Sequence, residues 1–410
     1  QGHLYTAYEV LEKRFGTATR RASSLLFLVT RNLGDGLRLF LAGIVLEQLL
    51  NWSFIASVMT MGTVTVLYTV VGGLRSVVWN DCIQFVIYVL GGLAAVYVIA
   101  GQIDGGWQQI LSFAETHGKL NPLNFTWKLS DPFTFWAGLF GGAVLTIGTH
   151  GTDHMMVQRY LSARSQADAG RAVLCSGVVV LLQFALFLFI GIELACFYAQ
   201  PGRTAPETSD RIFVSFIVEH FPANVGLIGL MLAAILSAAM STLSSSLNAS
   251  ASAVLNDFWI PLSRTKPDDA GQLKVSRMLT VAFGLLQVGI AIQAAHLQRS
   301  VVSNALAIAG FSAGILLGVF LLGVLSRRVG QRSALLGATV GLVVLCVVQF
   351  GPLYVPGLAE WKVAWPWFAL IGAATTYFAG AAAAYVRPDR GQDSGDTSAL
   401  NSSSALTNRP

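Results

Sequence analysis

Ten apolar stretches divide this chain, and each is close to the roughly 20 residues that an α-helix needs to cross a lipid bilayer. The segments between them hold most of the charged residues. This pattern predicts an all-α polytopic membrane protein, with one membrane domain over residues 1–386 and a polar, disordered cytoplasmic tail over 387–410. The expected spans are 24–50, 54–72, 80–101, 133–155, 171–197, 223–256, 276–296, 301–325, 333–350 and 366–386.

Composition and charge agree with this pattern. Hydrophobic residues make up 54% of the chain and charged residues 11%, whereas a soluble chain carries about 25% charged residues. Alternate loops hold 18 and 6 of the 26 Lys and Arg residues. Because cytoplasmic loops carry such an excess, we expect a protein of the cell's inner (plasma) membrane with both ends of this chain in the cytoplasm. The lipid bilayer is then its expected surroundings, and no basic patch indicates nucleic-acid binding.

The start of the chain and its polar residues limit the choice of function further. The sequence begins at Gln1 without an initiator Met or a signal sequence, so it resembles a fragment whose N-terminal part is missing. No nucleophile–base pair stands out. His150, Asp153 and His154 are too close together for a tetrahedral zinc site without further ligands. We therefore do not expect an enzyme.

The fourth expected span differs from a plain apolar helix. It reads FWAGLFGGAVLTIGTHGTDHMM, with several glycines around the polar stretch from Thr149 to His154. Glycines and polar residues in mid-span favour a broken helix, whose freed backbone groups face protein or a water-filled cavity. A straight helix whose glycines only permit close packing is the alternative.

Hydroxyl side chains are concentrated in the sixth span. A stripe of hydroxyl oxygens suits Na⁺, which like other hard cations prefers oxygen ligands. A packing face of small residues is the alternative reading. Four hydroxyls and one amide recur at helical spacings of three and four, with Thr242 beside their stripe and six hydroxyls in all between Ser237 and Ser246; the stripe is Ser237, Ser241, Ser244, Ser245 and Asn248.

Charged residues inside the membrane are the second chemical signal. Asp81 lies at the start of the third span, about one turn inside the cytoplasmic interface. A carboxylate there marks an ion pathway or a buried pair, or alternatively a helix-start acid favoured by the dipole. In the first span, Arg31, Asp35 and Arg38 can pair along one helix face. Arg38 is deep enough to meet an anionic solute, and a charge ladder that packs against a neighbouring helix is an equal alternative.

Three sequence runs resemble one known family. They are YTAYEVLEKRFG, YTVVGGLRSVVWNDCIQ and GTDHMMVQRYLSARS, and they are similar to the sodium:solute symporter family over nearly the whole chain up to about residue 386. The resemblance implies a leucine-transporter-like fold of two inverted five-helix repeats. The first three spans would be the third to fifth core helices, and spans four to eight the second repeat. The last two spans would be peripheral, and the first helices of the first repeat would precede Gln1.

The resemblance also implies site residues. The family's common sodium site falls on the carbonyl of Ala238 and the hydroxyls of Ser241 and Thr242. Some members, including sialic acid transporters, hold a second Na⁺ at positions that match Asp81, Ser241, Ser244 and Ser245. Na⁺ is then the expected co-transported ion.

The solute is less well defined by this resemblance. Sugar-transporting members carry a Tyr-Trp pair where this chain has Thr149-His150, which makes a sugar less expected. The candidate solute residues are Arg38, Thr149, His150 and Asp153, and they favour an anionic or polar non-sugar solute.

Two functions follow from the resemblance. The first is a sodium-coupled secondary active symporter that imports a small organic solute by alternating access. The second is a symporter-like membrane sensor, the input domain of a signalling protein. Such sensors append a kinase domain after the last helix, whereas this chain ends in a short polar tail, so we expect the symporter.

Overall fold

The computed structural model is helical over nearly all the residues that it describes, and no strand occurs among them. The expected tail lies outside the described residues from 388 onward. The structure describes residues 6–121, 123–161, 163–222, 226–263, 268–295 and 301–387.

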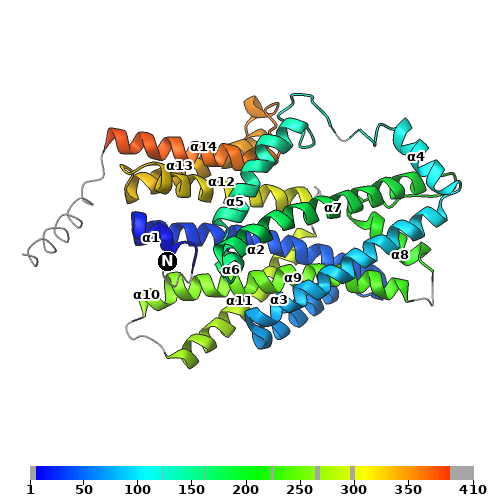
Figure 1. Cartoon of the computed structure of the whole chain (residues 1–410), viewed down its shortest axis with the longest axis horizontal. Helices are drawn as coiled ribbons and strands as arrows, with labels where there is room; N and C mark the ends of the chain where they lie inside the picture. The colour runs from blue at the N-terminus through cyan, green and yellow to red at the C-terminus, as the bar shows by residue number, and fades with distance from the viewer. Residues whose placement is uncertain are drawn as a thin grey trace, which may run out of the picture.

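The helices run largely along one common direction as a bundle, and α5 crosses it steeply (Figure 1). In chain order they are α1 (Glu9–Phe15), α2 (Thr17–Leu50), α3 (Phe54–Gln102), α4 (Gly106–Thr116), the π-helical η1 (Ala137–Gly142), α5 (Ala143–Thr152), α6 (His154–Leu161), α7 (Gln166–Tyr198), η2 (Ser209–Arg211), α8 (Ile212–His220), α9 (Leu227–Val254), the π-helical η3 (Leu255–Trp259), α10 (Ile260–Leu262), α11 (Asp269–Ala294), α12 (Val301–Leu325), α13 (Gln331–Tyr354), η4 (Pro356–Leu358) and α14 (Pro366–Val386).

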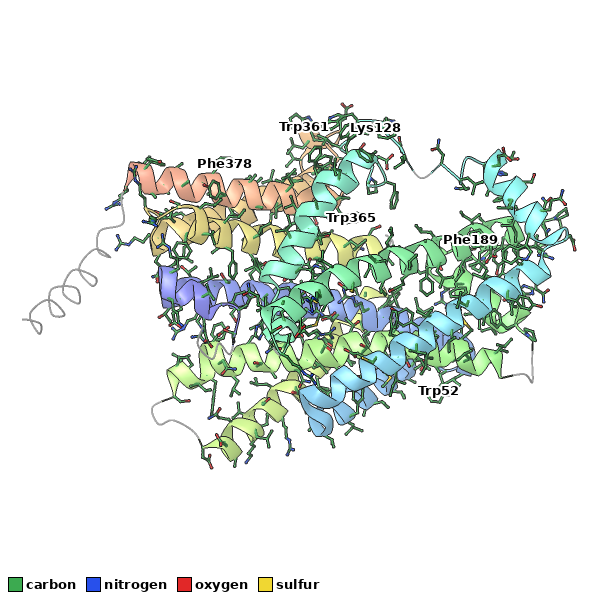
Figure 2. All side chains as sticks on the ribbon, in the orientation of Figure 1. Trp52, Lys128, Phe189, Trp361, Trp365 and Phe378 are labelled. Atoms are coloured by element: carbon green, nitrogen blue, oxygen red, sulfur yellow. The ribbon has the colours of Figure 1, made fainter. Side chains whose placement is uncertain are left out.

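Eight helical stretches in the described part of the chain are long and apolar enough to cross a membrane. Large apolar side chains on their outer faces are exposed, as for Phe378 on α14, which is 68% exposed (Figure 2). Such faces suit a lipid surrounding. The eight stretches are Phe54–Val71, Asp81–Gln102, Gln166–Tyr198, Leu227–Leu262, Asp269–Ala294, Val301–Leu325, Gln331–Tyr354 and Pro366–Val386.

The first expected span, 24–50, corresponds to α2 but is not among these eight stretches. The helix begins at Thr17, seven residues earlier than expected, and Arg31, Asp35 and Arg38 lower its apolar character. At about 1.5 Å per residue its 34 residues extend for about 51 Å. It packs against α9, α11 and α12, so its charges lie inside the bundle.

The fourth expected span, 133–155, is divided into η1, α5 and α6. The interruption is Asp153, whose φ of −72° and ψ of 122° are extended values. The prediction of a broken helix is therefore confirmed, and a straight helix is wrong. Gly148 holds α5 close to α12, because a Cβ at this position would lie 2.8 Å from the carbonyl oxygen of Ala313.

Helix α3 folds back on itself. Glu47, near the end of α2, pairs with Arg211 at 2.7 Å, and Gln102 at the end of α3 donates to the carbonyl of His220 at 3.3 Å. Both ends of α3 therefore lie near α8, at the end of the bundle where Figure 1 also shows α4. A straight helix of 49 residues would be about 73 Å long. The element thus contains two spans that run in opposite directions.

A buried polar network joins α2, α9 and α11 at the centre of the bundle. Asn32 donates to the hydroxyl of Ser250 at 3.3 Å, and Gln287 donates to Asn32 Oδ1 at 3.0 Å. All three side chains are almost fully buried. Because buried amides are costly unless they are hydrogen-bonded, this network fixes the register of the three helices.

Candidate functional site

The second half of α3 brings Asp81 against α9. The hydroxyl of Ser241 donates a hydrogen bond to Asp81 Oδ1, and the Asp81 side chain is 18% exposed. From the first half of α3, Tyr68 donates to the carbonyl of Met240 at 2.6 Å. Both halves of α3 therefore contact α9 at one level. The expected meeting of Asp81 with the hydroxyl stripe is confirmed.

Two further hydroxyls of this region bond to their own helix. Thr242 donates to the carbonyl of Ala238 at 3.3 Å, and Ser244 donates to the carbonyl of Ser241 at 3.1 Å. Both bonds are local to α9, and each hydroxyl oxygen keeps lone pairs that can accept. Ser244 and Ser245 are almost fully buried.

Arg159 supplies the positive charge next to Asp81. Its Nη2 atom lies 2.8 Å from Asp81 Oδ2 and 2.9 Å from the hydroxyl of Ser245. From the sequence, Arg159 counts among the 18 basic residues on the expected cytoplasmic side, and its contact with Asp81 was not predicted. Two signals could have identified it. It stands in the quoted run GTDHMMVQRYLSARS, and a carboxylate in a membrane requires a partner.

The break before α6 determines where Arg159 points. The Asp153 side chain accepts hydrogen bonds from the backbone N–H groups of Met155 and Met156, at 2.9 and 3.3 Å, which is the usual N-cap arrangement. Before the break, within α5, Thr149 donates to the carbonyl of Leu145 at 2.8 Å. The cap fixes the start of α6, and one and a half turns later Arg159 reaches both α3 and α9.

Two further contacts hold α6 in place. The ring of His154 is buried, and its Nδ1 accepts a hydrogen bond from the backbone N–H of Ala7 at 3.3 Å. Gln158 donates to the hydroxyl of Ser252 on α9 at 3.3 Å. Helix α6 is thus connected to the N-terminal segment as well as to α9.

A cavity of about 550 Å³ opens between α3, α7 and α9. Asp81 and Arg159 lie on its wall together with three predicted sodium-site residues, Ala238, Ser241 and Thr242. Gln84 also lines this cavity. Its side chain is 7% exposed, and its Oε1 atom accepts no hydrogen bond from the described residues. Hard oxygen atoms are therefore gathered at this wall.

A second cavity, of about 310 Å³, lies between α2, α5, α6 and α12. Of the candidate solute residues, Arg38, Thr149 and Asp153 line it. His150 does not, because its ring bonds back to the carbonyl of Thr146 at 3.1 Å and stacks beside Tyr160. The structure thus brings three of the four predicted solute residues together.

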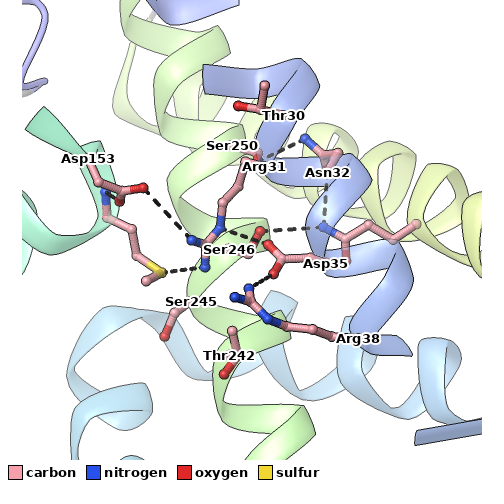
Figure 3. Close-up of polar contacts among 12 residues, drawn as sticks. Thr30, Arg31, Asn32, Asp35, Arg38, Asp153, Thr242, Ser245, Ser246 and Ser250 are labelled. Carbon is pink, nitrogen blue, oxygen red and sulfur yellow. Dashed lines mark hydrogen bonds and ion pairs between the residues drawn. The ribbon is translucent and has the colours of Figure 1, made fainter. Parts of the chain in front are cut away.

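Two arginines on α2 contribute positive charge to the second cavity, and one buried aspartate neutralises part of it. Arg31 Nε lies 2.7 Å from Asp35 Oδ2, and Arg38 pairs with the other oxygen of Asp35. Arg31 also reaches Asp153 at 3.9 Å (Figure 3). Asp35 is completely buried, whereas the Arg38 side chain is 42% exposed. The predicted pairing of these residues along one helix face is confirmed.

The two cavities share part of their walls. Arg159, Ser241 and Thr242 line both. The hydroxyls of Ser241 and Thr242, which are predicted to hold Na⁺, therefore lie between the two cavities. The first cavity contains Asp81 and Gln84, and the second contains Arg31 and Arg38.

Sequence comparison identifies the family. A profile of the sodium:solute symporter family matches residues 2–341. This chain belongs to the sodium:solute symporter family. It is a multi-pass membrane protein, and its relatives are transporters rather than enzymes.

Two curated members of the family and one solved structure illustrate the similarity. The chain is 30% identical to the sodium-dependent multivitamin transporter of Oryctolagus cuniculus over 362 residues, which cover 86% of this chain and 55% of that protein. It is 29% identical to the sodium/iodide cotransporter of Homo sapiens over 367 residues, with 88% and 56% covered. The chain thus spans little more than half the length of these curated relatives.

The fold comparison agrees with the family. A solved structure of a Na⁺-coupled sialic acid symporter, in a substrate-bound outward-open state, matches with a TM-score of 0.81 and 25% identity. The match covers 93% of this chain and 78% of that one. The fold is therefore the leucine-transporter-like arrangement that the sequence resemblance implied.

Proposed function

We propose that this protein is a sodium-coupled secondary active symporter that imports a small anionic organic solute by alternating access. The observation that supports this most directly is the shared wall of the two cavities. It places an acidic residue and the hydroxyls of α9 beside a cavity lined by arginines. Family membership supports the coupling to sodium.

In this proposal two sodium sites lie side by side on α9. The first uses the carbonyl of Ala238 and the hydroxyls of Ser241 and Thr242. Thr242 already lies 3.3 Å from that carbonyl, so a small rotation of its side chain would offer both oxygens to one cation. A hard cation prefers such oxygen ligands.

The second proposed site uses Asp81 with Ser241, Ser244 and Ser245. Ser241 contacts the carboxylate directly, and Ser245 accepts a hydrogen bond from the Arg159 nitrogen that also contacts Asp81. A bound Na⁺ would compensate the charge of a carboxylate that is costly inside a membrane.

The solute would bind in the cavity of about 310 Å³. Arg38, Thr149 and Asp153 from the sequence prediction line it, together with Arg31. Guanidinium groups bind carboxylates in a planar, bidentate geometry, which favours an organic acid. Two relatives are named for iodide and for sialic acid, and both of these solutes are anions at neutral pH.

The orientation is also a proposal. The excess of basic residues in alternate loops favours the inner (plasma) membrane with both ends of this chain in the cytoplasm. Na⁺ and the solute would then enter together from the outside.

The test is uptake by the full-length protein in proteoliposomes under an inward Na⁺ gradient or an equal K⁺ gradient. Labelled organic acids, iodide, amino acids and sugars would form the panel. We expect one class of anion to accumulate only with Na⁺. Ser241→Ala should reduce this uptake, whereas Ser237→Ala, one turn earlier on α9 and outside both cavity walls, should not. Equal uptake with K⁺ would contradict sodium coupling.

A further inference from the structure

We propose that Arg159 is an internal cation that competes with Na⁺ for Asp81. When Na⁺ binds, the guanidinium leaves Asp81 and its charge becomes available to the solute cavity. This inference rests on the proposed function and explains how Na⁺ binding and anion binding would be coupled.

Arg159 contacts oxygens that the second proposed sodium site would use. Ser241 donates to Asp81 Oδ1, and Arg159 donates to Asp81 Oδ2 at 2.8 Å. The same guanidinium nitrogen also bonds Ser245 at 2.9 Å. Two of the oxygens proposed for the second sodium site are therefore contacted by Arg159. A cation can coordinate them only when Arg159 withdraws.

The charged groups of the solute cavity balance one another while Arg159 is bound to Asp81. Arg31 and Arg38 are balanced by Asp35 and Asp153, which lie within ion-pair distance of them. With Arg159 held on Asp81, the cavity carries no net charge from these groups. Release of Arg159 adds one positive charge to the cavity wall. An anion then gains a positive charge that Asp81 no longer neutralises.

The position of Arg159 allows its side chain to reach both cavities. Arg159 lines both cavities, and its side chain is 37% exposed. A long, flexible side chain in this position can turn from one cavity to the other without movement of the backbone. Figure 3 shows Arg31, Arg38, Asp153, Thr242 and Ser245 around one common region, which is the region that Arg159 would enter.

The consequence is thermodynamic coupling. If Na⁺ makes Arg159 available to the anion, the anion must increase the affinity for Na⁺ by the same factor. A permanent structural ion pair between Asp81 and Arg159 would give no such coupling.

Binding of ²²Na⁺ to the purified full-length protein tests the competition. Arg159→Gln removes the competing cation, so the Na⁺ affinity should rise about fivefold. This is the size expected when a partly exposed ion pair no longer has to be broken. Arg159→Lys keeps a cation and should bind Na⁺ nearly as the wild type does. An unchanged or weaker Na⁺ affinity in Arg159→Gln would overturn the exchange while leaving sodium binding intact. Absence of Na⁺ binding in the wild type and in both variants would instead reject the proposed function.

Chemical modification tests the release of Arg159 in the wild-type protein. Phenylglyoxal reacts with guanidinium groups, and mass spectrometry of the peptide that contains Arg159 gives its rate. We expect Na⁺ to raise this rate several-fold over choline. In Asp81→Asn the rate should be high with or without Na⁺. Arg171, which is 80% exposed, is the internal control and should react equally in both salts. If the rate of modification of Arg159 in the wild type is the same with Na⁺ and with choline, in protein that binds Na⁺, the exchange is refuted.

Discussion

Two aspartates of this chain are each held by arginine, but in different surroundings. Asp35 is completely buried, and both of its arginines come from its own helix α2. Asp81 is 18% exposed, its arginine comes from the separate helix α6, and the pair borders two cavities. The first cluster can be formed by one helix alone. The second forms only when three helices meet.

This difference indicates different roles. A buried carboxylate between two cations cannot lose its partners without leaving uncompensated charge in the bundle. A partly exposed carboxylate beside a cavity can exchange one cation for another at lower cost, because water reaches the separated charges. We therefore interpret the Asp35 cluster as fixed structure and the Asp81 cluster as the exchangeable part.

The largest expected effect comes from Asp35→Asn. Removal of this charge leaves Arg31 and Arg38 without their shared partner, and breaking a buried pair costs about 3–5 kcal/mol. We expect a strong loss of folded protein, measured by yield and by thermal unfolding in detergent. The control is Asp168→Asn, which breaks an exposed pair with Arg171 and should change stability by less than about 0.5 kcal/mol. Equal stability of the two variants would remove the distinction between the clusters.

Asp81→Asn should affect transport rather than folding. The amide keeps the size of the side chain, and its oxygen can still accept the hydrogen bond from Ser241, but it removes the charge that would hold Na⁺. We expect a folded, inserted protein whose Hill coefficient for Na⁺ falls from about two toward one. The measurement is the Na⁺ dependence of solute uptake in proteoliposomes. Wild-type Na⁺ affinity and cooperativity would leave Asp81 as a structural partner of Arg159 and Ser241 and reduce the proposal to one ion.

Thr242→Ala should have a smaller effect, because it removes a single neutral ligand. The Na⁺ concentration for half-maximal uptake should rise by about 3- to 10-fold, the size expected for one lost oxygen contact. Thr339→Ala is a suitable control, since that hydroxyl also bonds only to its own helix, on the peripheral α13. An unchanged Na⁺ dependence of Thr242→Ala would exclude its hydroxyl from the cation site.

Arg38→Gln should change stability far less than Asp35→Asn does. Its side chain is 42% exposed, and Asp35 keeps Arg31 as a partner, so folding should weaken by less than about 1 kcal/mol. Uptake of the anionic solute should nevertheless require a higher concentration of solute. Thermal unfolding and the KM of uptake separate the two effects. A large loss of stability would show that Arg38 belongs to the fixed structure.

Much of the fold followed from the sequence because lipid imposes simple rules. Spans of about 20 apolar residues and the distribution of basic residues are readable without any contacts. The glycines and polar residues from Thr149 to His154 indicated the broken helix, although the break at Asp153 depends on its own capping contacts. The charged α2 shows the limit of such rules, since Arg31, Asp35 and Arg38 lower its apolar character although it packs against α9, α11 and α12 in the bundle.

The sequence by itself determined which residues share one face of one helix, and so it predicted the hydroxyl stripe of α9 and the Arg31–Asp35–Arg38 ladder. Only the tertiary structure decided which helix faces that stripe. Asp81 and Ser241 are 160 residues apart, and helical periodicity contains no information about partners at that separation. Arg159 shows most clearly why the tertiary structure decides the partner of a side chain. Its long side chain can reach the membrane surface or the interior, and the cap at Asp153 together with the folded-back α3 directs it to Asp81.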